Sequence, residues 1–208
     1  MRANPLYPVL AGVYDLLDVI YFRNWDKSPR KAVLDAISPQ DEILDLCTGT
    51  ASTAIAIAKA MPQAKIVGVD LSAKMLQVAR RKVEKAGIRN VELHEMDATR
   101  LRFEDGHFDV ILISLVLHEM DEDLRAKLLK EARRVLKKDG KIIVTEWERS
   151  PQASKRALFL PIHLLEPKPY RAFLHEDLYP YFEKHGLKIE RYTHHDYTKV
   201  ITLKHLDA

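Results

Sequence analysis

The sequence of 208 residues contains a single cysteine and only seven glycines. One cysteine cannot form a disulfide within the chain, which excludes a disulfide-stapled fold and fits a reducing compartment. The longest apolar run, Val110 to Leu117, is interrupted by Ser114 and falls far short of the roughly 20 residues that span a bilayer. The first residues also lack the apolar core of a signal peptide. We therefore expect a cytoplasmic protein without a transmembrane segment.

An excess of charge of one sign is also missing. The chain has 33 basic and 30 acidic residues, a formal net charge of +3. Its densest basic stretches, Arg80–Lys82 and Arg133–Arg134, fall on amphipathic helical patterns, so we expect them on solvated faces and predict no nucleic-acid partner. Six of the nine histidines lie beyond residue 160, but none stands at a recognised ligand spacing. We therefore predict no metal site.

What the sequence does contain is an alternation of short strands and amphipathic helices between residues 41 and 147. The length and the 47% hydrophobic content suit one domain with a full core. Alternation of this kind predicts parallel strands joined by right-handed crossovers. The expected strands are 43–46, 65–69, 91–96, 108–113 and 141–147, and Asp139-Gly140 is expected to form a tight turn before the last of them.

The last third of the chain has a different pattern. A helix is expected over 175–185, followed by two alternating segments, 187–192 and 198–203, whose short connection makes them antiparallel. The predicted single domain therefore has three parts: an N-terminal helical cap (1–40), a cofactor-binding core (41–147), and a lid helix with a C-terminal hairpin (148–208). Ser28-Pro29 and Ser72 are expected helix starts, and Gly87 an expected helix end.

A loop of small residues follows the first predicted strand. Cys47 to Ser52 connects a strand that contains Asp45 to a helix, which is where a doubly wound sheet binds a nucleotide-like ligand. Small residues suit this position because the backbone must approach the ligand closely.

Taken together, these segments resemble the class I S-adenosylmethionine-dependent methyltransferases, and most closely the group that contains the ubiquinone and menaquinone C-methyltransferases. The matching segments are 43–51, Asp70-Leu71-Ser72-x-x-Met75-Leu76, Asp97-Ala98, 133–140 and the N-terminal Tyr14-Asp15-Leu16-Leu17. The resemblance implies an α/β, Rossmann-like fold. Its seven-stranded sheet would be mostly parallel, with a C-terminal antiparallel hairpin and helices on both faces.

The resemblance also implies S-adenosylmethionine as the cofactor and S-adenosylhomocysteine as its product. Asp70 is expected to accept hydrogen bonds from the ribose hydroxyls. Asp97 is expected at the adenine amino group, with the Ala98 N–H donating to the ring. Asp45 is expected near the ligand's ammonium or hydrogen-bonded to the loop.

The remaining cofactor contacts follow the same resemblance. The loop is expected under the methionine part, Tyr14 at the cofactor carboxylate, and Leu71 and Met75 against the adenine or ribose, with ordinary core packing left open for Met75. The predicted cofactor-binding residues are Tyr14, Asp45, Thr48, Gly49, Thr50, Ala51, Asp70, Leu71, Met75, Asp97, Ala98 and Ser114.

Two loop positions depart from the usual glycines. Cys47 is expected to fill space. Ala51 carries a methyl group at the close-approach position, which calls for a wider loop or a negative φ. No diphosphate has to lie against this loop in a methyltransferase, so the departure favours S-adenosylmethionine over NAD.

His118 is the candidate catalytic residue, as a general base or a substrate-positioning group, because it follows the fourth strand and histidine titrates near neutral pH. Cofactor contact and capping of the next helix remain its alternatives. Glu119 and Glu146 are the next candidates. Trp147 is expected in the core or against a substrate.

The predicted function is methyl transfer to a small acceptor, and the apolar lid favours a lipophilic, quinone- or lipid-like one. The alternatives are a non-catalytic cofactor-binding protein on the same scaffold and an NAD-dependent oxidoreductase. The acceptor atom, a peripheral membrane contact and the choice between monomer and homodimer stay open.

Overall fold

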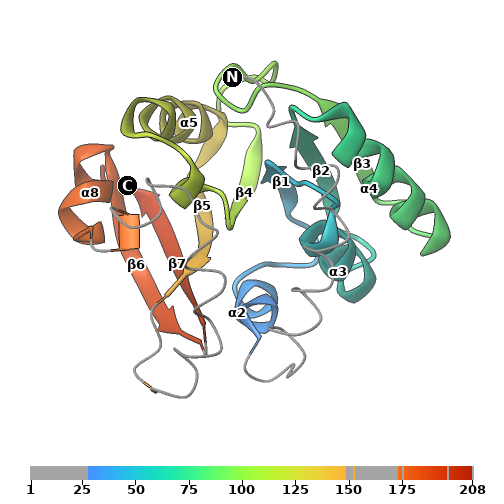
Figure 1. Ribbon diagram of the computed structural model, residues 1–208, viewed down its shortest axis with the longest axis horizontal. Coiled ribbons are helices and arrows are strands. Elements are labelled where there is room, and N and C mark those ends of the chain that lie inside the picture. Colours follow the sequence, from blue (N-terminus) through green and yellow to red (C-terminus); the bar gives the residue numbers. More distant parts are fainter. Residues whose placement is uncertain (1–27, 149–151, 153–172, 175, 196, 208) are drawn as a thin grey trace.

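The computed structural model describes residues 28–148, 152, 173–174, 176–195 and 197–207. Its centre is a seven-stranded sheet in the order β3-β2-β1-β4-β5-β7-β6 (Figure 1). The predicted Rossmann-like sheet is confirmed. Its strands are β1 (Glu42–Leu46), β2 (Lys65–Asp70), β3 (Val91–Glu95), β4 (Phe108–Ser114), β5 (Leu136–Trp147), β6 (Leu187–His194) and β7 (Thr198–His205).

The first five strands pair in parallel, and β7 runs antiparallel to both β5 and β6. Parallel neighbours need long crossovers, and helices supply them. The helices are α2 (Pro29–Asp35), α3 (Ser52–Ala60), α4 (Ala73–Lys85), the 3-10 turn η2 (Leu117–Glu119), α5 (Glu122–Val135) and α8 (Leu178–Lys184). The C-terminal hairpin is confirmed, while Tyr14 and the lid segment over 149–151 and 153–172 lie outside the described residues.

Helices cover both faces of the sheet, as expected. Side chains of α2, α3 and α4 pack on one face, against Ile43 and Ile66, and those of α5 and α8 pack on the other, against Leu44 and Leu46 (Figure 1). Successive strand residues point to opposite faces, so neighbouring apolar residues serve both layers. All carboxyl ends of the parallel strands consequently meet at one edge of the sheet.

The predicted helix boundaries at Ser28 and Ser72 are confirmed. Ser28 Oγ accepts a hydrogen bond from the Arg30 N–H at 3.2 Å, and Ser72 Oγ accepts one from the Met75 N–H at 3.3 Å. Each bond satisfies a backbone donor that the first helical turn leaves without a partner. Gly87 follows the end of α4 with φ +66°, a conformation that glycine adopts without a steric cost.

The tight turn expected at Asp139-Gly140 is wrong. Strand β5 already begins at Leu136, and its pairing with β4 shifts register between Phe108↔Leu136 and Val110↔Lys141. A Cβ on Gly140 would lie 2.9 Å from the Asp109 carbonyl oxygen. Because Gly140 has no side chain, the backbone of β5 can approach that of β4 closely at this point.

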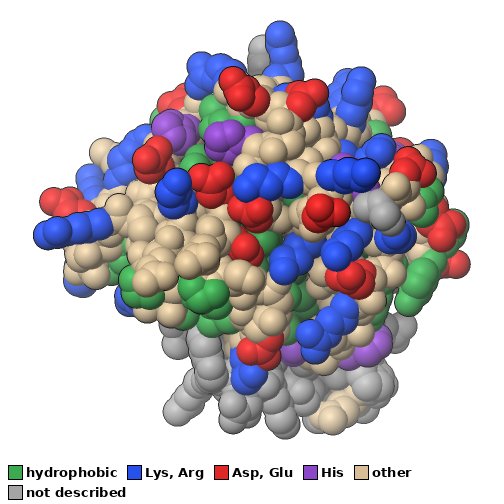
Figure 2. Space-filling view, turned by 180° about the vertical axis from the view of Figure 1, so that it is seen from behind, with side chains coloured by type: hydrophobic (Ala, Val, Ile, Leu, Met, Phe, Trp, Pro, Cys, Tyr) green, Lys and Arg blue, Asp and Glu red, His purple; other side chains and the backbone are tan. Residues whose placement is uncertain are grey.

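The solvated face expected for Arg133 and Arg134 is found only in part, because both residues are half-buried. The Arg133 guanidinium donates to the His185 carbonyl oxygen at 2.9 Å, and that of Arg134 donates to the carbonyl oxygens of Phe103 and Leu101. Both arginines thus join α5 to neighbouring loops. Elsewhere, Figure 2 shows acidic and basic side chains interspersed over the face seen from behind.

Candidate functional site

The loop after β1 turns sharply through left-handed backbone. Cys47, Gly49 and Ala51 have φ values of +56°, +56° and +59°. The negative φ considered for Ala51 is therefore wrong, and its buried methyl group is accommodated in a conformation that costs a non-glycine residue about 1 kcal/mol or more. The Thr48 N–H donates to the Val69 carbonyl oxygen at 3.0 Å, which ties the loop to β2.

Asp70, the last residue of β2, lies directly against this loop. Its Oδ2 accepts a hydrogen bond from the Gly49 N–H at 2.9 Å, and its Oδ1 accepts one from the Ser72 N–H at 2.8 Å. Burial raises the pKa of Asp70, and these backbone hydrogen bonds oppose the rise. Each carboxylate oxygen has a second lone pair, so the group still has capacity to accept from a ligand.

Asp45 lies in β1, below the same loop. Its side chain is buried and accepts a hydrogen bond from the Thr48 hydroxyl at 2.5 Å. Burial raises the pKa of Asp45 to about 7; the Thr48 hydrogen bond opposes this, and the charge of Asp70 adds to it. The structure thus gives Asp45 the loop contact that was one of its two expected positions.

Four carboxylates act together on the Cys47 thiol. Burial is the largest cause of its raised pKa, and the charges of Asp70, Asp45, Glu119 and Asp97 raise it further. No cation stands among these causes. Carboxylates at the ends of β1, β2 and β3 thus outnumber the Lys82 ammonium, which donates to Thr50 and Ser52 of the loop, and this excess suits a cationic ligand better than a diphosphate.

The other predicted cofactor residues lie around this loop. Asp97 follows β3, where its carboxylate accepts from the N–H and hydroxyl of Thr99, and Ala98 beside it is buried. A Cβ on Gly49 would lie 3.8 Å from Met75 Cε, so Met75 packs beside the loop.

Three further predicted residues are less specifically placed. Thr50 Oγ1 accepts from the Lys82 ammonium at 3.0 Å. Leu71 follows Asp70 and is half-buried. Ser114 ends β4, next to Leu115, whose φ is +53°.

His118 forms a buried pair with Glu146. Its Nδ1 lies 2.7 Å from Glu146 Oε2, and both side chains are almost fully excluded from solvent. Burial would raise the pKa of Glu146, but the charge of His118 and hydrogen bonds from it and from backbone N–H groups hold it below its ordinary value. Glu146 is thus an ionised acceptor, which assigns the Nδ1 proton to His118 as donor.

Glu146 also shapes the segment after β4. Its Oε1 accepts from the N–H groups of Val116 and Leu117 at 3.1 and 2.8 Å. The alternative that His118 caps the next helix is wrong, because the Asp121 side chain caps α5 by accepting from the Leu124 N–H. Trp147 is the last residue of β5 and is buried, as its core interpretation expected.

Sequence analysis missed Lys199, a buried lysine near the start of β7. It pairs across the strands with Glu146. Its position held a signal, because Lys199, Ile201 and Leu203 share one face of an alternating strand and the other two are core residues. A lysine on the core face of a strand is rarely buried without a reason.

The comparisons with known proteins agree with this geometry. Residues 43–140 match a protein family described as "Methyltransferase domain". A demethylmenaquinone methyltransferase of Bacillus cereus is 36% identical over 150 residues, which are 70% of this chain and 62% of that protein. The chain belongs to the class I S-adenosylmethionine-dependent methyltransferases. It spans less than two thirds of the length of this Bacillus relative.

Solved structures share the fold of this methyltransferase domain. A SAM-dependent methyltransferase from Aquifex aeolicus superposes with a TM-score of 0.74 at 20% identity, over 94% of this chain and 97% of that one. A SAM-dependent methyltransferase from Methanosarcina mazei gives 0.62 at 16% identity, over 84% and 97%. In the part of the chain that the structure describes, no helix has the length and apolarity to cross a membrane.

Proposed function

We propose that the protein transfers a methyl group from S-adenosylmethionine to a small, lipophilic, quinone- or lipid-like acceptor. The observation that carries this proposal is the loop after β1, where Asp70 accepts from the Gly49 and Ser72 N–H groups and the buried Asp45 accepts from the Thr48 hydroxyl. The name of the Bacillus relative, a demethylmenaquinone methyltransferase, supports a quinone-like acceptor.

The residues at the loop fit S-adenosylmethionine, which carries a sulfonium and an ammonium. Asp70 would accept from the ribose hydroxyls while keeping its bonds to the loop backbone. A positive charge on the ligand would oppose the effect of the Asp70 charge, which raises the pKa of Asp45. Asp97, Ala98, Leu71 and Met75 would contact the nucleoside.

When bound, S-adenosylmethionine supplies an electrophilic methyl group. The chain must then hold the acceptor in line with it and exclude water. We propose that His118 faces the acceptor side. In its neutral form His118 keeps the Nδ1 proton in the hydrogen bond to Glu146, so Nε2 is the nitrogen that would receive a proton from an acceptor that arrives protonated.

The oxidoreductase alternative is not favoured, because a dinucleotide would bring two negative phosphates to this acidic loop. A non-catalytic cofactor-binding protein would share the same site. We further propose a cytoplasmic location, a small-molecule acceptor with no nucleic acid, and a monomer or homodimer.

The test uses the purified protein, methyl-labelled S-adenosylmethionine and a lipid extract of the source cells, with chemically reduced 1,4-naphthoquinone as a defined acceptor. Label that enters the organic phase only with active protein supports the proposal. Asp70→Asn is the matched control that should transfer none. Label confined to polar products would contradict the lipophilic acceptor. Cofactor binding without any transfer would favour the non-catalytic alternative.

A further inference from the structure

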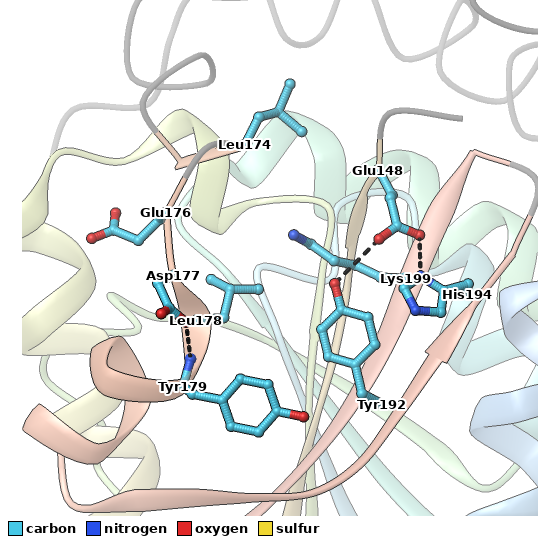
Figure 3. Close-up of a pocket in the computed structure, with 9 residues that line it drawn as sticks. All are labelled: Glu148, Leu174, Glu176, Asp177, Leu178, Tyr179, Tyr192, His194 and Lys199. Atoms are coloured by element: carbon cyan, nitrogen blue, oxygen red, sulfur yellow. Dashed lines mark hydrogen bonds and ion pairs between the residues drawn. The ribbon is translucent and has the colours of Figure 1, made fainter. Parts of the chain in front are cut away.

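A cavity of about 640 Å³ opens between α8 and the β6–β7 hairpin, beyond the end of β5 (Figure 3). Apolar and aromatic walls come from Leu174, Leu178, Tyr179 and Tyr192. Tyr179 is 56% exposed, although it is a large aromatic side chain. Flat aromatic surfaces beside leucines suit a ring-shaped ligand of similar polarity.

Lys199 is the charged group in this cavity that needs a partner. Only 5% of the residue is exposed, and Figure 3 shows its amine directed away from β7 into the cavity. Its Nζ lies 5.8 Å from the centroid of the Phe173 ring, and it forms no hydrogen bond or ion pair within 4 Å with the residues that the structure describes. Burial lowers the pKa of Lys199, and the charges of Glu148 and Glu146 oppose this only in part.

The carboxylates of the cavity are already engaged. Glu148 accepts from the Tyr192 hydroxyl at 3.2 Å and from His194 Nδ1 at 2.8 Å. Asp177 caps α8 by accepting from the Tyr179 N–H at 3.2 Å.

The third carboxylate, Glu176, lies 3.6 Å from the Arg125 guanidinium. Glu148 and Glu146 act on the Lys199 ammonium without forming an ion pair with it, so an anionic ligand group in the cavity would supply the direct partner that it lacks.

The cavity adjoins the segment that carries His118. Lys199 is the cross-strand partner of Glu146, and directly opposite residues on antiparallel strands lie about 5 Å apart. Glu146 in turn forms the 2.7 Å pair with His118. A ligand anchored at Lys199 would therefore lie beside the edge at which the acceptor is expected.

We infer that this cavity binds the acceptor through Lys199, and that the acceptor is a flat aromatic molecule with an anionic oxygen, such as a carboxylate or an ionised ring hydroxyl. The inference rests on the proposed function, because it names the substrate class of that site. It adds a charge to the lipophilic acceptor and a residue that recognises the charge.

The test measures binding of three naphthalene probes that differ in charge, by their own fluorescence and without methyl transfer. They are 2-naphthoate, 2-naphthol and 2-naphthylmethylammonium. The wild-type protein should bind the anion most tightly. Lys199→Met should weaken 2-naphthoate binding about 10- to 100-fold and change 2-naphthol binding less than about 3-fold. Lys199→Arg should retain part of the affinity.

Lys204→Met is the matched control. It removes the same charge from the same strand, but Lys204 pairs with Glu190 at the surface. Circular dichroism checks folding, and Lys199→Met should melt no lower than the wild type because it removes a buried charge whose burial Glu148 and Glu146 offset only in part. Equal loss in both variants, or preferential binding of the ammonium probe, overturns the inference.

Calorimetry with S-adenosylhomocysteine separates this result from the proposed function. If the protein binds the cofactor but binds the anionic, neutral and cationic probes equally well, only the role of Lys199 is refuted. Selective anion binding without any cofactor binding supports the anion site and refutes the proposed methyl transfer.

Discussion

The two halves of the sheet's carboxyl edge differ in the sign of the charge that lacks an ion-pair partner. At the ends of β1 to β3, burial raises the pKa of both Asp45 and Asp70, and the charge of Asp70 raises that of Asp45 further. At the ends of β4 and β5 and the start of β7, Glu146 and Glu148 each have histidine partners, and the group without a direct ion pair is the cation Lys199.

This difference indicates what each half is suited to bind. A site with excess carboxylate gains from a positively charged ligand, and one with a solitary buried ammonium gains from a negatively charged one. A sulfonium cofactor and an anionic acceptor would meet between them. Four predictions test this division, from the largest expected effect to the smallest.

The largest effect is expected for Asp70→Asn, which tests the acidic half. The substitution keeps the shape of the side chain but removes its charge and one acceptor oxygen facing Gly49 or Ser72. Hydrogen bonds to a charged group contribute about 1.5–3 kcal/mol each, so affinity for S-adenosylmethionine should fall about 100- to 1,000-fold. Calorimetry measures it.

Asp35→Asn is the matched control, because Asp35 is exposed and pairs with Lys31 one turn back on α2. Its affinity should equal that of the wild type. An Asp70→Asn protein that folds and binds the cofactor normally would remove Asp70 from the site.

Glu146→Gln tests the paired half. Loss of the charge frees the His118 ring and weakens the hold on the segment after β4, so the rate of methyl transfer should fall about 100-fold while cofactor affinity changes little. Because the folded pKa of Glu146 lies below its ordinary 4.5, its stabilising contribution is present above that pH and is lost as pH falls through the folded pKa.

Thermal melts at a series of pH values below 4.5 measure the loss of the stabilising contribution of Glu146. The stability difference between the wild type and Glu146→Gln should narrow as pH falls. The control is Glu190→Gln, whose charge pairs with Lys204 at the surface. An unchanged turnover rate in Glu146→Gln would show that the buried pair is only structural.

The acidic half was predicted better from the sequence than the other half, because its contacts join residues that are close in the chain. The loop, Asp70 and the cap at Ser72 lie within one strand–loop–helix unit and its neighbour, so motif and periodicity located them. The start of β5 was missed because it depends on a register shift against β4, which no local pattern encodes.

The second half depends on residues far apart in the chain. His118 and Glu146 are 28 positions apart, and each was a separate candidate in the sequence without any sign that they pair. Lys199 looked like one more lysine in an alternating strand, and only its neighbours in the sheet bury it. Arg133 was likewise assigned to solvent, because its acceptor, the His185 carbonyl, comes from another element.

A third prediction concerns protons at Asp45. With a pKa of about 7, this carboxyl binds a proton below neutrality in the free protein, and a cationic ligand should expel it. As pH increases towards 7, affinity for S-adenosylmethionine should therefore rise about tenfold per pH unit, and it should be constant above pH 7. Asp45→Asn should abolish the slope.

Calorimetry in two buffers of different ionisation enthalpy detects the released proton directly. The same carboxyl should destabilise the free protein as pH rises from about 4 towards 7, since the folded state then holds the proton more tightly than the unfolded state. A binding constant that is flat from pH 5 to 8 would contradict the assignment of a cation to this half.

The smallest effect is expected from strain in the loop of the acidic half. Ala51 and Ala54 are both fully buried, but Ala51 has φ +59° whereas Ala54 lies inside α3. Replacing either residue by glycine removes one methyl group and adds the same conformational entropy to the unfolded chain. The difference in free energy of unfolding between the two variants therefore reports the cost of the backbone conformation. Ala51→Gly should be more stable than Ala54→Gly by about 1–2 kcal/mol in chemical denaturation. Equal stabilities would mean that the left-handed conformation at Ala51 costs the free protein nothing.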